Sequence, residues 1–202
     1  PSCPQRRRVC RGCCLYRPLR APSIHTRLPL HQNSPAATRE MPRGHRGAAG
    51  LETENTLPSF QRALDLGCAA IELDVQHGAS GETQWVIHDH TVNRTTNGHG
   101  RVKDLTDSDL QTLRCTNGAT IPKLSDVLDL VTRQSQVAAT TVGVNVELKG
   151  PMTARAVAET LRNYQQIPIL VSSFDHSELR RFRDIDPNTD VAPLFHAWQD
   201  SV

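Results

Sequence analysis

From residue 42 onward, strand-like runs alternate with segments in which apolar residues recur at the 3.6-residue period of a helix. The strand-like runs occupy residues 42–46, 69–75, 84–88, 142–148, 168–174 and 191–195. The helical patterns occupy residues 56–66, 106–113, 124–131 and 153–163, and one more begins after Asp175. Because this alternation favours parallel strand pairing through βαβ crossovers, we expect an α/β fold built on a parallel sheet.

Individual residues mark where the predicted helices begin and end. Thr56 is a candidate cap for the first helix, Pro58 is tolerated in its first turn, and Gly67 stops it. Thr106 and Asp109 stand in the relation of a capping box at the start of the second helix. These boundaries support the helices independently of the apolar pattern.

At 202 residues the chain is long enough for one large core, or for most of a single-domain barrel of about 250 residues, but not for two full domains. Its apolar residues, 37% of the total, cluster in the strand-like and helix-like runs. No apolar run approaches the roughly 18 residues that a membrane-spanning helix needs. We therefore expect a soluble globular domain without a transmembrane segment.

The net charge of +2 is the sum of two unlike segments. Residues 1–39 contain eight arginines and no acidic residue, whereas the remainder has the other 15 of the 23 basic residues against all 21 acidic ones, a net charge of −6. The first segment is also rich in proline and lacks periodicity, which is typical of disorder. We expect a disordered Arg-, Cys- and Pro-rich leader at residues 1–40 and one mildly acidic domain at residues 41–202.

Three interpretations of the leader remain open. Its composition resembles an organellar transit peptide, and it also suits an arm that binds nucleic acid. Alternatively, these residues lie upstream of the natural start, because the chain begins with proline and Met41 immediately precedes the first organised segment. The leader cysteines, with Cys13 and Cys14 adjacent, match no standard zinc finger. Only Cys68 and Cys115 remain downstream, so we expect a reducing, cytoplasmic compartment.

Charged and imidazole side chains stand where the predicted strands end. They are His45, Glu72 and Asp74, His88, and Glu147 and Lys149, at the ends of the first four strands in turn. In parallel α/β folds the chemistry collects at the carboxyl ends of the strands. Residues two apart on a strand point to the same face, so Glu72 projects with Asp74, and Glu147 with Lys149. We expect these side chains to converge.

Three converging carboxylates, those of Glu72, Asp74 and Glu147, would repel one another unless a cation lay among them. Hard oxygen ligands favour Mg²⁺ or Ca²⁺ over Zn²⁺. Arg46 offers a fork-shaped donor and Lys149 a compact charge, both suited to phosphate oxygens. The pattern therefore predicts a metal-assisted phosphate site.

Histidine supplies the remaining chemistry, because imidazole gains and loses protons near neutral pH. His45 and His88 stand with the other candidate site residues, and Asp89 is expected to orient or cap the loop after His88. Taken alone, a Glu-Leu-Asp tripeptide is usually a solvated strand end, and a His-Asp pair is usually a hydrogen-bonded loop element. Complementary groups at four successive strand ends are what indicates a site. The other histidines of the domain keep a structural interpretation: His77, His90, His99, His176 and His196.

Several short motifs follow one another along the domain. They are His45-Arg46-Gly47, Glu54-Asn55-Thr56, Ile71-Glu72-Leu73-Asp74, Val86-Ile87-His88-Asp89, Arg94-Thr95-Thr96-Asn97-Gly98, Ile121-Pro122-Lys123-Leu124, Asn145-Val146-Glu147-Leu148-Lys149 and Ser172-Ser173-Phe174-Asp175. In this order they resemble the glycerophosphodiester phosphodiesterase family. The resemblance implies a TIM (β/α)8-type barrel that hydrolyses glycerophosphodiesters to an alcohol and glycerol 3-phosphate with a divalent cation, Mg²⁺ or Ca²⁺.

The resemblance also implies a role for each matching position. Glu72, Asp74 and Glu147 would hold the metal, His45 and His88 would be the acid/base pair, Arg46 and Lys149 would bind the substrate phosphate, and Glu54 and Asn55 would fix the loop after the first strand. One histidine would activate the glycerol 2-hydroxyl to attack phosphorus while the other protonates the leaving alcohol, and water would then open the cyclic intermediate. Direct attack by water stays open, as does which histidine is the base first. The expected partner is a small glycerophosphodiester, with no nucleic acid.

Two features depart from the family pattern. Residues 41–44 offer almost no apolar side chain, so the first strand is expected to be weakly anchored. The chain also supplies only about six strands, and the last two strand–helix units of an eightfold barrel are absent. We therefore expect a truncated barrel with two open strand edges, unstable or inactive as it stands although the full-length parent is active.

Two other readings of the function remain open. A related lysophospholipase D or sphingomyelinase D-type barrel would carry an apolar surface loop near the site, and residues 91–103 are polar instead. A non-catalytic binding module, with the leader engaging nucleic acid, would have no use for matched charges at strand ends. Alanine at His45 or His88 distinguishes an enzyme from a binding module, because an enzyme loses turnover and a binding module is indifferent.

Overall fold

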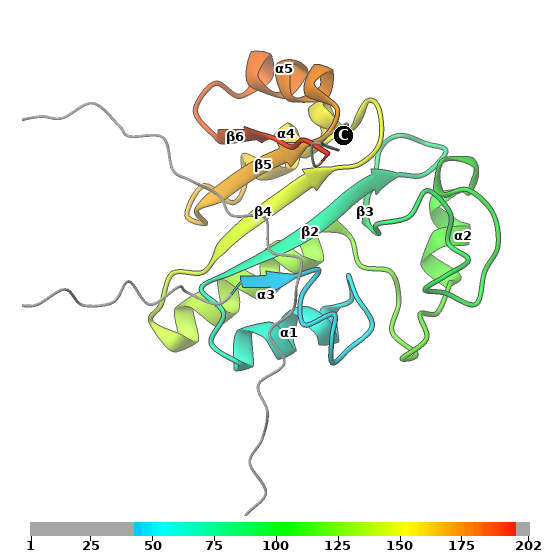
Figure 1. Ribbon diagram of the computed structural model, residues 1–202, viewed down its shortest axis with the longest axis horizontal. Coiled ribbons are helices and arrows are strands. Elements are labelled where there is room, and N and C mark those ends of the chain that lie inside the picture. Colours follow the sequence, from blue (N-terminus) through cyan, green and yellow to red (C-terminus); the bar gives the residue numbers. More distant parts are fainter. Residues whose placement is uncertain (1–42, 197–202) are drawn as a thin grey trace, which may run out of the picture. The chain divides into compact units, whose positions relative to one another are not determined.

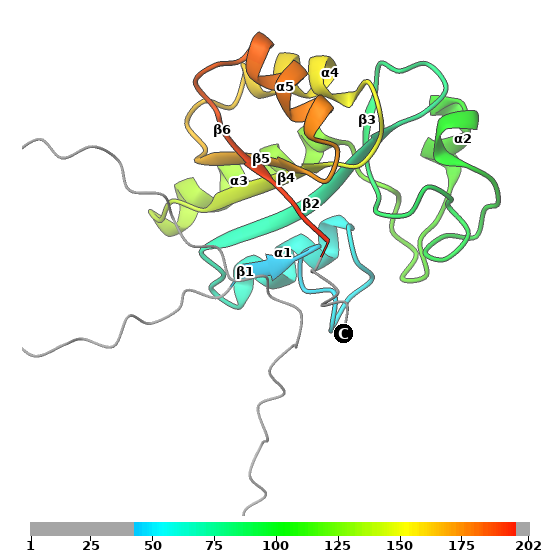
Figure 2. The same ribbon diagram turned by 45° about the horizontal axis from the view of Figure 1, so that its top comes forward.

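The computed structural model describes residues 43–196, and residues 1–42 and 197–202 lie outside it. The predicted leader at residues 1–40 therefore falls outside the described residues. Figures 1 and 2 show a twisted sheet with helices packed against it. No helix in the described part of the chain is both long and apolar enough to cross a membrane.

Six strands form one sheet with the spatial order β1-β2-β4-β5-β6, and β3 pairs with β2 outside this row (Figure 1). They are β1 (Arg43–His45), β2 (Ala70–His77), β3 (Gln84–Val86), β4 (Gly143–Leu148), β5 (Ile169–Ser173) and β6 (Asp190–Pro193). Neighbours along this row all pair in parallel, as the alternation of strands and helices predicts. Within residues 43–196, β1 and β6 are the edges and the sheet is not closed, in agreement with the expectation of an open barrel.

The prediction of a parallel strand at residues 84–88 is wrong in its direction and length. β3 runs antiparallel to β2, with Val86 opposite Val75 and Gln84 opposite His77, and it ends at Val86. The physical reason is the connection, because residues 78–83 form only a turn and a parallel crossover needs a dozen or more residues. The hairpin instead turns the chain back along β2. His88 is therefore a loop residue and not the end of a parallel strand.

The first strand is anchored by close packing in place of large apolar side chains. β1 pairs with β2 over its whole length, from Arg43 opposite Ala70 to His45 opposite Glu72. Gly44, at its centre, is buried, and a Cβ placed there would lie 2.8 Å from the Cβ of Ala63. Glycine thus lets the helix after β1 approach the strand directly. This contact offsets the weak apolar pattern of residues 41–44.

The helices are α1 (Leu57–Asp65), α2 (Asp107–Thr112), α3 (Leu124–Ala138), α4 (Thr153–Leu161) and α5 (His176–Ile185), with a 3-10 turn at Val102–Asp104. The predicted caps are confirmed, since Thr56 accepts a hydrogen bond at the start of α1 and Thr106 and Asp109 form a capping box at the start of α2. Helix α3 is longer than the predicted 124–131. Its second half buries no apolar side chain, so the periodic signal stops before the helix does.

The main core lies on the helix-covered face of the sheet. On β2, the side chains of Ile71, Leu73 and Val75 are buried there, together with apolar residues of α1, α3, α4 and α5. Because side chains alternate along a strand, Glu72 and Asp74 project to the opposite face. The same packing that buries the apolar side chains therefore presents the carboxylates together.

A second, smaller apolar cluster organises the segment after β3, residues 91–121. Its members are Trp85, Ile87, Val92, Val102, Leu110, Cys115 and Ile121. The Trp85 indole N–H also donates to Asp107 Oδ1 at 2.8 Å, which ties α2 to β3. Residues 91–103, predicted as a polar loop, thus have apolar anchors at Val92 and Val102, both completely buried.

Candidate active site

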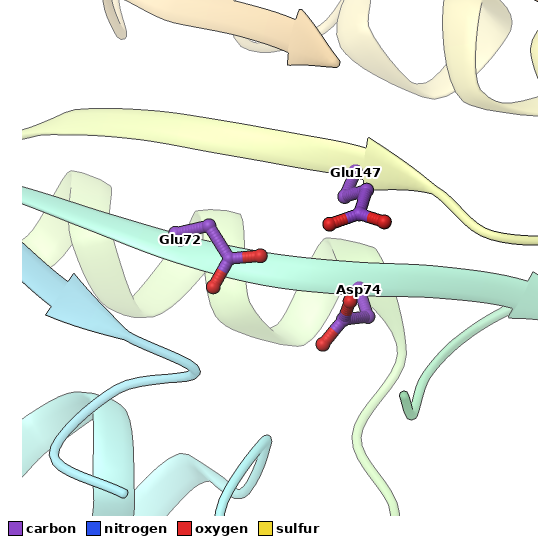
Figure 3. Close-up of side chains that lie close together, drawn as sticks. All are labelled: Glu72, Asp74 and Glu147. Atoms are coloured by element: carbon purple, nitrogen blue, oxygen red, sulfur yellow. The ribbon is translucent and has the colours of Figure 1, made fainter. Parts of the chain in front are cut away.

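Three carboxylates from two adjacent strands face one another on the sheet. Glu72 and Asp74 come from β2 and Glu147 from β4, and Asp74 and Glu147 are direct partners in the strand register. One oxygen of each group lies within 4.8 Å of the others. Figure 3 shows the three side chains projecting from the two strands toward a common space. The predicted convergence of these residues is thus present in the fold.

The cluster has the character of a cation site. Glu72 Oε1, Asp74 Oδ1 and Glu147 Oε1 are all buried, and among the described residues their one cationic neighbour is the Lys149 ammonium, 3.1 Å from Glu147 Oε1 and 3.9 Å from Asp74 Oδ1. Leaving such a group unsatisfied is costly, whereas a bound cation would coordinate it. The donors are all carboxylate oxygens, which suit a hard divalent ion. Glu72, Asp74 and Glu147 therefore fit a metal ion by position and by chemistry.

The burial and close approach of the carboxylates also shift the pKa values of Glu72 and Glu147. Burial, together with the nearby charge of Asp74, raises the pKa of Glu72 to about 8. Burial and Asp74 likewise raise the pKa of Glu147, although the Lys149 ammonium, 3.1 Å from Glu147 Oε1, opposes this shift. Without a cation, the site therefore retains protons to a higher pH than isolated carboxylates do.

This shift predicts how the stability of the metal-free chain depends on pH. The folded chain holds the Glu72 proton more tightly than the unfolded chain, so the stabilisation is complete below about pH 4.5 and is lost as the pH rises through about 8. We expect the free energy of unfolding, measured by urea titration in EDTA, to fall by a few kcal/mol across this window. The variant Glu72→Gln should show a much flatter profile. A wild-type profile that is flat or rises with pH would contradict this prediction.

The His-Arg-Gly turn after β1 holds Arg46 against the carboxylates. The Arg46 backbone N–H donates to Glu72 Oε2 at 2.9 Å, and its side-chain Nε lies 3.3 Å from Asp74 Oδ2. Gly47 has a φ of +78°, and a Cβ there would lie 2.7 Å from the backbone carbon of Ser59. Only glycine fits this close approach to α1, which is the physical reason for glycine in the turn.

The Glu-Asn-Thr segment completes this side of the site. Asn55 Nδ2 donates to Asp74 Oδ2 at 2.8 Å, and the Asn55 backbone N–H donates to the Arg46 carbonyl at 3.1 Å. Glu54 Oε1 accepts a hydrogen bond from Arg46 Nη1 at 3.1 Å. Glu54 and Asn55 thus contact the two groups, Arg46 and Asp74, that lie at the centre of the site.

The two histidines approach the carboxylate cluster from two different segments, the end of β1 and the loop after β3. His45, the last residue of β1, has its Nε2 3.7 Å from Glu72 Oε2, and desolvation and the Arg46 charge lower its pKa. His88 reaches the site because the hairpin returns along β2, where the Ile87 N–H donates to the Asp74 carbonyl at 2.9 Å. Its Nε2 lies 3.2 Å from Lys149 Nζ. Lys149 in turn contacts Glu147, so His88 and the cluster share one neighbour.

Arg94 is a site residue to which sequence reasoning assigned no role. Its guanidinium donates to both oxygens of Asp89 and to both oxygens of Glu54, at 2.6–2.9 Å. Asp89 Oδ1 lies 2.7 Å from His88 Nδ1. The only signal in the sequence was the Arg-Thr-Thr-Asn-Gly motif, which begins with Arg94. The partners of Arg94, Asp89 and Glu54, lie five and forty residues before it.

Comparisons with known proteins place the chain among its relatives. The sequence profile of the Glycerophosphoryl diester phosphodiesterase family matches residues 45–201. A glycerophosphodiester phosphodiesterase of Bacillus altitudinis is 39% identical over 74% of this chain and 64% of its own length. One of Caldanaerobacter subterraneus subsp. tengcongensis is 34% identical over 75% of this chain and 65% of its own length. The chain thus spans just under two thirds of these curated relatives.

Solved structures show the same fold. A phosphodiesterase of Oleispira antarctica, solved in complex with the product sn-glycerol-3-phosphate, superimposes with a TM-score of 0.71 at 26% identity, over 79% of this chain and 67% of that one. A glycerophosphodiester phosphodiesterase of Agrobacterium tumefaciens gives a TM-score of 0.65 at 32% identity, over 74% of this chain and 64% of that one. By sequence and by fold, the chain belongs to the glycerophosphoryl diester phosphodiesterase family.

Proposed function

We propose that this chain carries the site of a metal-dependent hydrolase that cleaves glycerophosphodiesters to an alcohol and glycerol 3-phosphate. The observation that carries the proposal is the group of three carboxylates that bring buried oxygens within 4.8 Å of one another, with His45 beside Glu72. The names of the relatives and the glycerol 3-phosphate bound to the Oleispira protein support the same substrate class.

In this proposal Glu72, Asp74 and Glu147 hold one divalent cation, Mg²⁺ or Ca²⁺. When bound, the cation supplies positive charge that stabilises the phosphoryl transition state. Arg46 and Lys149 stand against the same carboxylates, with Arg46 Nε 3.3 Å from Asp74 and Lys149 Nζ 3.1 Å from Glu147. Their charges would bind the phosphate oxygens that approach the cluster.

His45 and His88 perform the proton transfers in the proposed reaction. One takes the proton of the glycerol 2-hydroxyl as this oxygen attacks phosphorus, and the other gives a proton to the leaving alcohol. The roles reverse when water opens the cyclic phosphodiester, so each histidine ends in its starting state. His88 is suited to this exchange because its Nδ1 is held by Asp89 while its Nε2 faces Lys149.

A phosphodiester panel tests the proposed function. A chain that extends these 202 residues through the two absent strand–helix units, treated with EDTA and resupplied with Mg²⁺ or Ca²⁺, is expected to release glycerol 3-phosphate from glycerophosphocholine and glycerophosphoethanolamine only when metal is present. The 202-residue chain itself is expected to do so slowly or not at all. Lysophosphatidylcholine and sphingomyelin serve as comparison substrates. Choline release from these two lipids alone would favour the lysophospholipase D or sphingomyelinase D alternative, and metal-independent turnover would contradict the proposed site.

The compartment is a separate proposal. Cys68 and Cys115 are both free thiols in the described part of the chain, which supports a reducing, cytoplasmic environment.

A further inference from the structure

The Arg94 guanidinium joins two carboxylates that serve different parts of the site. Its Nε and Nη2 donate to Asp89 Oδ2 and Oδ1 at 2.6 and 2.9 Å. Its Nη1 and Nη2 donate to Glu54 Oε2 and Oε1 at 2.9 and 2.7 Å. Both edges of the planar group are therefore engaged in paired hydrogen bonds. A lysine ammonium has no such fork and cannot hold two carboxylates in this geometry.

The hydrogen bonds between Arg94 and Asp89 determine which ring nitrogen of His88 carries a proton. Asp89 Oδ1 lies 2.7 Å from His88 Nδ1, and an ionised carboxylate only accepts hydrogen bonds, so Nδ1 carries the proton. Nε2 faces Lys149 Nζ at 3.2 Å, and because an ammonium only donates hydrogen bonds, Nε2 accepts with its lone pair. The hydrogen bonds from Arg94 hold the pKa of Asp89 well below its usual value, which keeps Asp89 an acceptor.

The hydrogen bonds between Arg94 and Glu54 connect Arg94 to Arg46. Glu54, which Arg94 holds, accepts from Arg46 Nη1 at 3.1 Å, and Arg46 Nε lies 3.3 Å from Asp74. Opposite charges thus alternate from Asp74 through Arg46, Glu54 and Arg94 to Asp89. The network links the turn after β1 to the loop after β3.

The backbone around Arg94 is itself held in place. Thr96, which is buried, donates from its hydroxyl to the Val92 carbonyl at 2.7 Å and accepts from the Gly98 N–H at 3.0 Å. Val92 is completely buried in the second apolar cluster. The loop therefore presents Arg94 from a fixed base, and the Arg94 side chain is the part that reaches Glu54 and Asp89.

We propose that Arg94 is a positioning residue that fixes the orientation and tautomer of His88 by clamping Asp89 and Glu54. The kinetic consequence rests on the proposed function of His88 in proton transfer, whereas the structural consequence does not. Loss of the clamp frees the Asp89 carboxylate to rotate, and the His88 ring then samples both neutral tautomers. The clamp acts through Asp89, and Arg94 itself touches no reacting atom.

The first experiment reads the tautomer directly in the 202-residue chain. Two-dimensional ¹⁵N–¹H NMR correlation of the histidine rings, assigned with His88→Gln, is expected to show the Nδ1–H tautomer of His88 in the wild type. Arg94→Lys and Arg94→Ala should give averaged ring ¹⁵N shifts, the sign of mixed tautomers. Arg101→Ala is the matched control, because it removes the same charge from an exposed position of the same loop and leaves Arg94, Glu54 and Asp89 in place. Unchanged His88 shifts in Arg94→Ala would overturn the proposal, as would equal averaging in Arg101→Ala.

The second experiment measures turnover in the chain extended through the two absent strand–helix units. We expect Arg94→Lys and Arg94→Ala to lower kcat by about tenfold to a hundredfold with little change in KM, as for other groups that orient a site residue. Added guanidinium should restore part of the kcat of Arg94→Ala, since it can reoccupy the gap between the two carboxylates. Unchanged kcat would overturn the proposal. If the wild type has no turnover, the proposed function fails, and the NMR result alone decides whether the clamp exists.

Discussion

Replacing Asp74 with asparagine is expected to lower metal-dependent turnover by about a thousandfold or more, since a catalytic cation contributes several kcal/mol of transition-state stabilisation. Asp74 lies at the centre of the site: it is 1% exposed, faces Glu147 in the register, and accepts from Asn55. Asparagine keeps the size and one acceptor oxygen, so the change removes charge and little else. Initial rates of glycerol 3-phosphate release measure the loss of turnover, and calorimetric titration of Mg²⁺ and Ca²⁺ measures the loss of metal affinity.

Glu159→Gln provides the matched control for this change. Glu159 lies on α4, and its half-exposed side chain pairs with Arg155 on the same helix. The Glu159→Gln substitution therefore removes the same charge as Asp74→Asn, but outside the site. We expect this variant to bind metal and turn over substrate as the wild type does. Circular dichroism of Asp74→Asn checks that its fold is intact. Metal binding and turnover near wild-type values in a folded Asp74→Asn protein would contradict the proposed metal site.

Replacing His88 or His45 with alanine is expected to lower kcat by about a hundredfold to ten-thousandfold, the range typical of general acid/base catalysis. The fold should persist, because both side chains lie outside the two apolar clusters. A non-catalytic binding module would show no such dependence. His99→Ala is the control, since His99 lies in the loop after β3, where its Nδ1 is 3.3 Å from Asn93 Nδ2.

A substrate with a better leaving group separates the two histidine roles. From a glycerophosphodiester of p-nitrophenol, the p-nitrophenolate leaves without the help of a general acid. The variant that lacks the acid of the first step should therefore regain most of its rate of p-nitrophenol release in a single turnover. The variant that lacks the base should stay slow on both substrates. Full activity of both alanine variants on glycerophosphocholine would remove His45 and His88 from the mechanism and return the binding-module interpretation to consideration.

Much of the fold followed from local patterns. The caps at Thr56 and Thr106 were predictable because a side-chain oxygen needs only a backbone N–H two or three residues away. The strands β2, β4 and β5 were predictable because buried parallel strands are dense in apolar residues. The direction of β3 was missed because its residues resemble those of a parallel strand. The brevity of the turn at residues 78–83 was the better guide.

The site residues were likewise predictable only where a local sequence pattern marked them. His45, Glu72, Asp74, His88, Glu147 and Lys149 were candidates because they interrupt or follow strand-like runs. Arg94 was not, since an arginine in a polar loop has no periodic signal and its partner Glu54 stands forty residues earlier in the chain. Ion pairs between loops depend on how the loops pack, which no local pattern records.

By itself, the sequence determined the kinds of elements, their order, and the chemical groups beside them, because these depend on periodicity and side-chain type. Only the tertiary structure decided that Glu72, Asp74 and Glu147 place oxygens within 4.8 Å of one another, that a hairpin returns His88 to the carboxylates, and that Arg94 holds Asp89 against His88. The physical reason is that strand register and loop contacts arise from packing between distant segments.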